Sequence, residues 1–252
     1  MIVDALVTLG TSRFGMQLQP ETALERCRAG GIDMAVATAP HPVDHDFDRA
    51  NRELADAVDA ASGRLVGLCR VDPWDGEDAL ALLERSVNEH GHRGLLLHPA
   101  EEHFRINDAR LIPLAQLAEN LGIPVLVAAG YPWLSEPSQV AQFAGWCPGV
   151  PVVMTNGGQF NISGLSQIDA EAALRLDNVH IQTSGVYRED FLQKVVRTFG
   201  VERVMFASAA PYFDLDYERM RVGLLHVAEE ERAQIFAGNA QRVFRLDERV
   251  NA

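Results

Sequence analysis

Eight short apolar segments, each followed by a segment with helical periodicity, constrain the fold of this chain more than any other feature. Apolar runs of four to eight residues are typical of strands buried on both faces, and their alternation with helices is typical of a parallel sheet. The eight runs cover residues 2–9, 34–38, 65–71, 94–98, 124–129, 150–155, 179–183 and 203–207. Because eight βα units close on themselves, we predict an α/β fold, a single (β/α)8 barrel.

The chain length agrees with this prediction. At 252 residues the chain has about the usual size of one such barrel, and no linker or low-complexity tract divides it. We therefore expect one domain over residues 1–252. After the eighth apolar run the pattern predicts three further helices, over residues 217–228, over 229–237 and from Asn239 onward, which we interpret as closing helices of the barrel.

The composition excludes several classes of partner. Thirteen more acidic than basic side chains (35 against 22) disfavour nucleic acid, because phosphate contacts need clustered Lys and Arg. No apolar run reaches the roughly 18 residues of a membrane span, and the first residues lack the features of a signal peptide, so we expect a cytoplasmic protein. The three cysteines, Cys27, Cys69 and Cys147, lie in apolar stretches and predict buried free thiols.

The first apolar run carries a resemblance to a known family. Residues 4–10 read D-A-L-V-T-L-G, which resembles the first strand of the metal-dependent amidohydrolases related to aminocarboxymuconate semialdehyde decarboxylase, typically D-A-H-V-H-L-G. In that family the two histidines point the same way from alternate strand positions and bind a divalent metal at the barrel mouth. Leu6 and Thr8 occupy the corresponding positions of this chain.

Later segments extend the resemblance over almost the whole chain. Residues 122–127 (G-I-P-V-L-V), 154–158 (M-T-N-G-G) and 203–211 (R-V-M-F-A-S-A-A-P) are similar to the family's fifth, sixth and eighth strands, and residues 238–244 (G-N-A-Q-R-V-F) are similar to its ending. Ala128 stands where the family has a metal-binding histidine, and Thr155 stands where a histidine lies close to the metal. Ala209 stands where the family has its catalytic aspartate. The resemblance thus implies an amidohydrolase-like barrel whose metal-binding residues are lost.

This pattern leaves three hypotheses open. The leading one is a pseudoenzyme without a metal or other cofactor, which acts as a structural or regulatory subunit and forms a homodimer or a heterodimer with an intact amidohydrolase relative. The alternative is a metal-independent hydrolase, lactonase or lyase acting on a small carboxylated substrate. The third is a protein that binds a small molecule without converting it.

Candidate functional residues are sought directly after each predicted strand, because function in this fold gathers at the carboxyl ends of the strands. The candidate catalytic residues are His98, His41 and Arg13. The candidate binding residues are His45, Tyr131, Asn156 and Ser208. Arg13 and Arg70 are suited to clamp a carboxylate, and surface or loop ion pairs are the commoner explanation for such residues. A metal relocated to His41, Asp44 and His45 is a further hypothesis, set against an ordinary polar loop.

Overall fold

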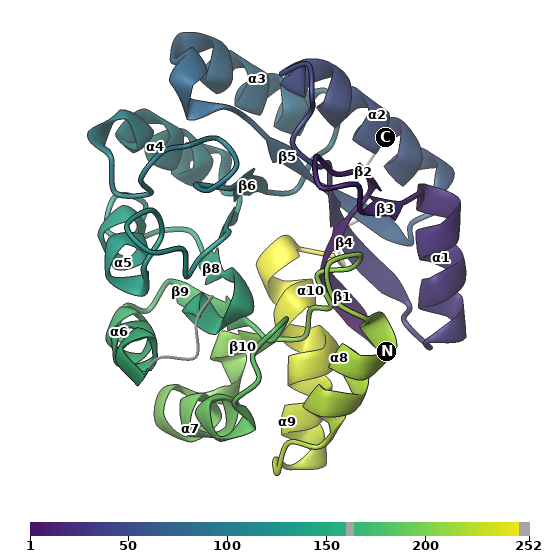
Figure 1. Cartoon of the computed structure of the whole chain (residues 1–252), viewed down its shortest axis with the longest axis vertical. Coiled ribbons are helices and arrows are strands. Elements are labelled where there is room, and N and C mark those ends of the chain that lie inside the picture. Colours follow the sequence, from purple (N-terminus) through teal and green to yellow (C-terminus); the bar gives the residue numbers. More distant parts are fainter. Residues whose placement is uncertain (160–163, 247–252) are drawn as a thin grey trace.

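Eight parallel strands surround the centre of the molecule in chain order, with helices around them (Figure 1). This computed structural model describes residues 1–159 and 164–246, and the side chains of residues 164–166 lie outside the description. The strands are β1 Val3–Thr8, β4 Met34–Thr38, β5 Leu65–Arg70, β6 Leu95–Leu97, β7 Val125–Val127, β8 Val152–Met154, β9 Val179–Gln182 and β10 Val204–Met205. The predicted (β/α)8 barrel is confirmed, and most of the strands are shorter at their ends than the apolar runs.

Backbone contacts between the first and the last strand bring the two edges of the sheet together. Val7 forms a parallel bridge with Ala210. The amide of Ala5 donates to the carbonyl of Phe206 at 2.9 Å, and the amide of Thr8 donates to the carbonyl of Ala210 at 2.8 Å. These bonds pair the edge groups that an open sheet would leave without partners.

A buried carboxylate lies beside this seam. Asp4 accepts hydrogen bonds from the amide of Ser208 at 2.8 Å and from its hydroxyl at 2.5 Å. Burial raises the pKa of Asp4 to about 6, although the hydrogen bonds from Ser208 and from the Leu6 amide oppose this shift. Asp4 therefore ties the first strand to the segment after the last one.

The helices lie outside the sheet and follow the strands in order (Figure 1). The α-helices are α1 Pro20–Ala29, α2 Phe47–Ala60, α3 Glu77–Asn88, α4 Ile112–Leu121, α5 Pro137–Ala144, α6 Gly164–Ala173, α7 Glu189–Phe199, α8 Leu215–Gly223, α9 Glu229–Ala233 and α10 Asn239–Phe244. Short 3-10 helices cover Pro73–Asp75, Ala109–Leu111, Thr155–Gly158 and Val201–Arg203, and a π-helical turn covers Gln234–Gly238. None of the described helices is long and apolar enough to cross a membrane.

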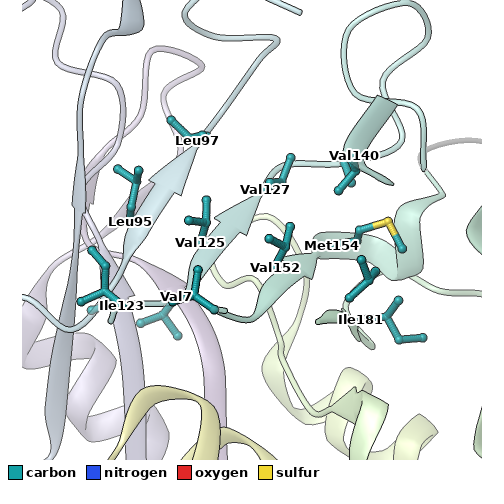
Figure 2. Packing of buried hydrophobic residues seen from close by; sticks show 14 of the residues in the cluster. Val7, Leu95, Leu97, Ile123, Val125, Val127, Val140, Val152, Met154 and Ile181 are labelled. Carbon is teal, nitrogen blue, oxygen red and sulfur yellow. The ribbon is translucent and has the colours of Figure 1, made fainter. Parts of the chain in front are cut away.

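Alternation along the strands separates two apolar layers. In β6, Leu95 and Leu97 belong to the layer between strands and helices, where Figure 2 shows them with Val125 and Val127 of the next strand. Leu96, between them, belongs to a second cluster inside the barrel. Because side chains of a strand alternate between its two faces, the next inward position after Leu96 is residue 98. Counted in the same way from Leu126 of β7 and Val153 of β8, the next inward positions are residues 128 and 155.

The segment after the eighth strand covers one end of this interior. Ala240, Val243 and Phe244 of α10 are buried and belong to the cluster inside the barrel. The predicted closing helices are thus confirmed, with a break at residues 224–228 and the π-helical turn before α10.

One element was not predicted from the sequence. A two-stranded antiparallel hairpin, β2 Gly10–Thr11 paired with β3 Gln17–Leu18, follows directly after the first barrel strand. Strands of two residues leave no periodicity in a sequence, so the hairpin could not be distinguished from a loop. The three cysteines are buried and free, as predicted.

Candidate functional site

A cavity of about 400 Å³ lies at the carboxyl ends of the barrel strands. The polar side chains in its wall are Thr8, Thr38, Arg70, His98, Glu101, Thr155 and Asn156. The aromatic side chains are Phe14, Tyr131, Tyr212 and Phe213. The apolar remainder consists of Leu6, Leu96, Ala128 and Ala209. We call this cavity the mouth pocket, and its position is where the active sites of (β/α)8 barrels are found.

All five positions that the family resemblance singled out line this single pocket: Leu6, Thr8, Ala128, Thr155 and Ala209. They come from four different strands or the loops after them, so the barrel itself brings them together. None of the five side chains carries an imidazole or a carboxylate. The Thr155 hydroxyl oxygen accepts a hydrogen bond from the amide of Ala129 at 3.1 Å.

An arginine at the end of β5 forms the charged part of the wall. Arg70 is almost completely buried, and its Nη2 atom contacts Glu101 Oε2 and lies 2.6 Å from Glu102 Oε1. Its Nε atom donates to the same Glu102 oxygen at 2.9 Å. The His41 Nδ1 atom lies 3.1 Å from that oxygen as well. Arg70, Glu101, Glu102 and His41 are called the arginine cluster below.

Neighbouring elements hold the arginine cluster in place. Asn51 of α2 pairs with the backbone of Arg70 on both sides: its side chain accepts from the Arg70 amide and donates to the Arg70 carbonyl, each at 2.9 Å. Glu101 and Glu102 follow β6, the strand beside β5. Parallel neighbouring strands end at the same edge, which places their following residues next to Arg70.

Opposite charges decide the ionisation of the cluster. Burial acts to raise the pKa of Glu101, but the Arg70 guanidinium outweighs it and holds this pKa below its usual value. Burial also acts to lower the pKa of Arg70, yet the two carboxylates raise it above the usual value. The cluster thus holds a guanidinium against ionised carboxylate, and Glu102 Oε2 has no hydrogen-bond partner among the described residues.

His98 stands beside the cluster as a neutral base. Its Nδ1 atom accepts a hydrogen bond from the Glu101 amide at 3.2 Å, so the neutral ring carries its proton on Nε2. Burial, followed by the charge of Arg70, lowers the pKa of His98 to about 4. The ring also contacts Tyr131, whose pKa burial raises to about 12. Near neutral pH both side chains are uncharged.

The predicted site residues divide into two groups. His98, Tyr131 and Asn156 line the mouth pocket. His41 lies in the arginine cluster and lines a neighbouring groove of about 500 Å³ between the hairpin and α2. Arg13 is exposed on the hairpin, donates to the Glu101 carbonyl at 3.5 Å, and lies 5.7 Å from the centre of the Phe14 ring. Their roles stay predictions.

The other two predicted binding residues do not line the mouth pocket. His45 is exposed, has a φ of 60°, and packs edge-on against His41. Ser208 is completely buried and bonded to Asp4. Ala207 and Ala209 both belong to the cluster inside the barrel, so Ser208, between them, points to the opposite face of the strand.

The predicted metal site at His41, Asp44 and His45 does not match the arrangement of the loop that carries these residues. Asp44 is exposed and forms two hydrogen bonds with Arg49 Nη2, at 2.8 and 2.9 Å. Among the described residues, the metal-ligand atoms that lie together belong instead to His41, Glu101 and Glu102, all within 4.8 Å of one another. The Arg70 guanidinium lies against both of these carboxylates.

From the sequence, Arg70 was predicted either to clamp an anion or to form an ordinary ion pair, and Glu101 and Glu102 were not selected as its partners. A signal was present, because an arginine ends one predicted strand and two adjacent glutamates follow the next strand. Neighbouring parallel strands end at the same edge of the sheet, which brings these side chains together.

Comparison with known proteins agrees with the fold. The amidohydrolase family model matches residues 15–246, so the chain belongs to this amidohydrolase family. The gamma-resorcylate decarboxylase of Rhizobium radiobacter is 33% identical over 73 residues, which cover 29% of this chain and 22% of that protein. The chain thus aligns with less than a quarter of that relative's length.

Solved structures of low identity share the whole fold. One is 2,6-dihydroxybenzoate decarboxylase complexed with 2,6-dihydroxybenzoate, with a TM-score of 0.81, 18% identity, and coverage of 98% of this chain and 100% of that one. Another is dihydroxybenzoic acid decarboxylase from Polaromonas with bound manganese and 2-nitroresorcinol, with a TM-score of 0.79, 16% identity, and coverage of 98% of each chain.

Proposed function

We propose that this chain is a pseudoenzyme of the amidohydrolase family, which keeps the barrel and its pocket without the metal-dependent chemistry. The observation that carries the proposal is the mouth pocket itself, where Leu6, Thr8, Ala128, Thr155 and Ala209 stand together. A divalent metal needs imidazole, thiolate or oxygen ligands, and leucine and alanine supply none. Two threonine hydroxyls do not make a ligand set. These residues do not fit the family's metal.

The ligand atoms of the arginine cluster do not fit a metal either. Arg70 Nη2 is 2.6 Å from Glu102 Oε1 and also contacts Glu101, so a positive charge already lies against both carboxylates. A divalent ion bound to His41, Glu101 and Glu102 would be repelled by this guanidinium, which is buried and cannot turn away into solvent. We interpret Arg70 as the cation of this site.

A pseudoenzyme with an open pocket is suited to regulation through a bound small molecule. We therefore propose a cytoplasmic regulatory or structural subunit that forms a homodimer or pairs with an intact amidohydrolase relative. The support for ligand binding is the cavity of about 400 Å³, whose wall is largely apolar and aromatic with a few polar groups, as is typical of small-molecule sites.

A turnover assay tests this proposal. The purified protein is incubated with 2,6-dihydroxybenzoate in the presence of Mn²⁺, of Zn²⁺ or of a chelator, and carbon dioxide release is measured. We expect no rate above that of the same solution without protein in any of the three. Decarboxylation that requires Mn²⁺ or Zn²⁺ and stops with the chelator would contradict the proposal.

A metal-independent enzyme is the second candidate, and one observation favours it. Arg70, Glu101 and His98 converge on a pocket that Leu6 and Leu96 do not fill. A neutral imidazole beside a carboxylate is suited to move a proton. The test is turnover of an ester or lactone in the presence of the chelator. Turnover that is lost in His98→Gln and kept in His226→Gln, a control at an exposed position, would support this candidate.

A further inference from the structure

The mouth pocket has the shape and surface of a site for a small ring. Aromatic side chains form one part of its wall: Phe14, Tyr131, Tyr212 and Phe213. Leu6, Leu96, Ala128 and Ala209 supply an apolar part. Aromatic walls with offset or edge-on geometry favour a flat aromatic ligand.

The charged side chains of the wall, Arg70 and Glu101, pair with each other. Glu102 does not line the pocket and contacts the same guanidinium. Arg70 directs Nε and Nη2 to these carboxylates, and its Nη1 donates to the Ala39 carbonyl at 3.4 Å. The guanidinium is therefore already engaged, and it lacks the free bidentate face with which an arginine binds a ligand carboxylate.

The histidine in the wall adds no positive charge. His98 Nδ1 accepts a hydrogen bond from the Glu101 amide, and an imidazolium cannot accept there. His98 is therefore a neutral ring that donates through Nε2. The pocket thus combines a carboxylate acceptor, Glu101, with an uncharged donor, His98.

A hydroxyl group matches this pair, because it donates one hydrogen bond and accepts another, whereas a carboxylate only accepts. We infer that the mouth pocket binds an uncharged aromatic molecule bearing hydroxyl groups and discriminates against the carboxylated form of the same ring. This inference rests on the proposed function, since it concerns the ligand of the proposed regulatory pocket. It reverses the sequence-based expectation of a small carboxylated substrate.

Calorimetric titration at pH 7.5 in buffer with a chelator tests the inference. The probes are resorcinol, 2,6-dihydroxybenzoate and benzylammonium, which share a ring and differ in charge. We expect resorcinol to bind at least about ten times more tightly than 2,6-dihydroxybenzoate, because the Glu101 carboxylate in the wall repels a ligand carboxylate and the Arg70 guanidinium is already engaged. A dihydroxybenzoate that binds as tightly as resorcinol, a benzylammonium that binds more tightly, or a resorcinol that does not bind would each overturn it.

Two variants connect the preference to the pocket. Glu101→Gln removes one negative charge and keeps an acceptor, so the ratio of the two affinities is expected to fall several-fold. Glu53→Gln, on the exposed side of α2 and outside the mouth pocket, is the matched control and is expected to keep the ratio. An unchanged ratio in Glu101→Gln would contradict the assigned role of the cluster.

This titration is separable from the test of the proposed function. The chelator removes metal-dependent turnover, so the preference between ligands is measured whatever the turnover assay finds. Turnover with Mn²⁺ combined with a preference for resorcinol would refute the pseudoenzyme and leave the ligand class standing.

Discussion

Replacing Arg70 by methionine is expected to lower the free energy of unfolding by about 3–5 kcal/mol, because it leaves two buried carboxylates without their cation. Glu101 and Glu102 are both almost completely buried, and Arg70 is their shared partner. Urea denaturation followed by circular dichroism gives the free energy, provided that the transition has two states.

Two further variants separate this effect from a general loss of packing. Arg49→Met removes an arginine whose partners Asp44 and Glu53 are exposed, and little change is expected there. Arg70→Met combined with Glu101→Gln and Glu102→Gln removes the unpaired charges, so it is expected to recover much of the loss. A cost below about 1 kcal/mol for Arg70→Met alone would show that the cluster is not held by its charges.

The second large effect concerns the pH dependence of stability. The pKa of Asp4 is about 6 in the folded chain against an ordinary value of 3.8, so the folded state holds this proton more tightly than the unfolded state. The corresponding stabilisation is complete below about pH 4 and is lost as the pH rises through 6. The difference between these two pKa values of Asp4 corresponds to about 3 kcal/mol of unfolding free energy.

Asp4→Asn removes this titration. The difference in unfolding free energy between the parent and Asp4→Asn is therefore expected to change by about 3 kcal/mol between pH 4 and pH 7, in the direction that favours the parent at low pH. Asp56→Asn, at an exposed position of α2, is the control and is expected to give a constant difference. A constant difference for Asp4→Asn would show that burial does not perturb this carboxyl.

The fold was predictable because it rests on local periodicity. The family resemblance pointed to positions 6, 8, 128, 155 and 209, and the structure places all five in one pocket. Ser208 was chosen only because it follows the eighth predicted strand. Alternation places it on the opposite face from Ala207 and Ala209, where it bonds to Asp4 instead of lining the pocket.

The arginine cluster was not predictable in the same way. Arg70 and its glutamates are more than thirty residues apart, and their pairing depends on how the loop after β6 lies against the end of β5. The position of Arg13 likewise depends on a hairpin with two-residue strands. Such contacts are tertiary, and no repeat in the sequence encodes them.

Metal stoichiometry decides whether the chain has a metal site. The protein is equilibrated with excess Mn²⁺ or Zn²⁺, freed of unbound ions by gel filtration and analysed by mass spectrometry for metal content. We expect far less than one ion per chain. One Mn²⁺ or Zn²⁺ per chain, lost in Glu102→Gln, would contradict this expectation and would establish His41, Glu101 and Glu102 as a metal centre.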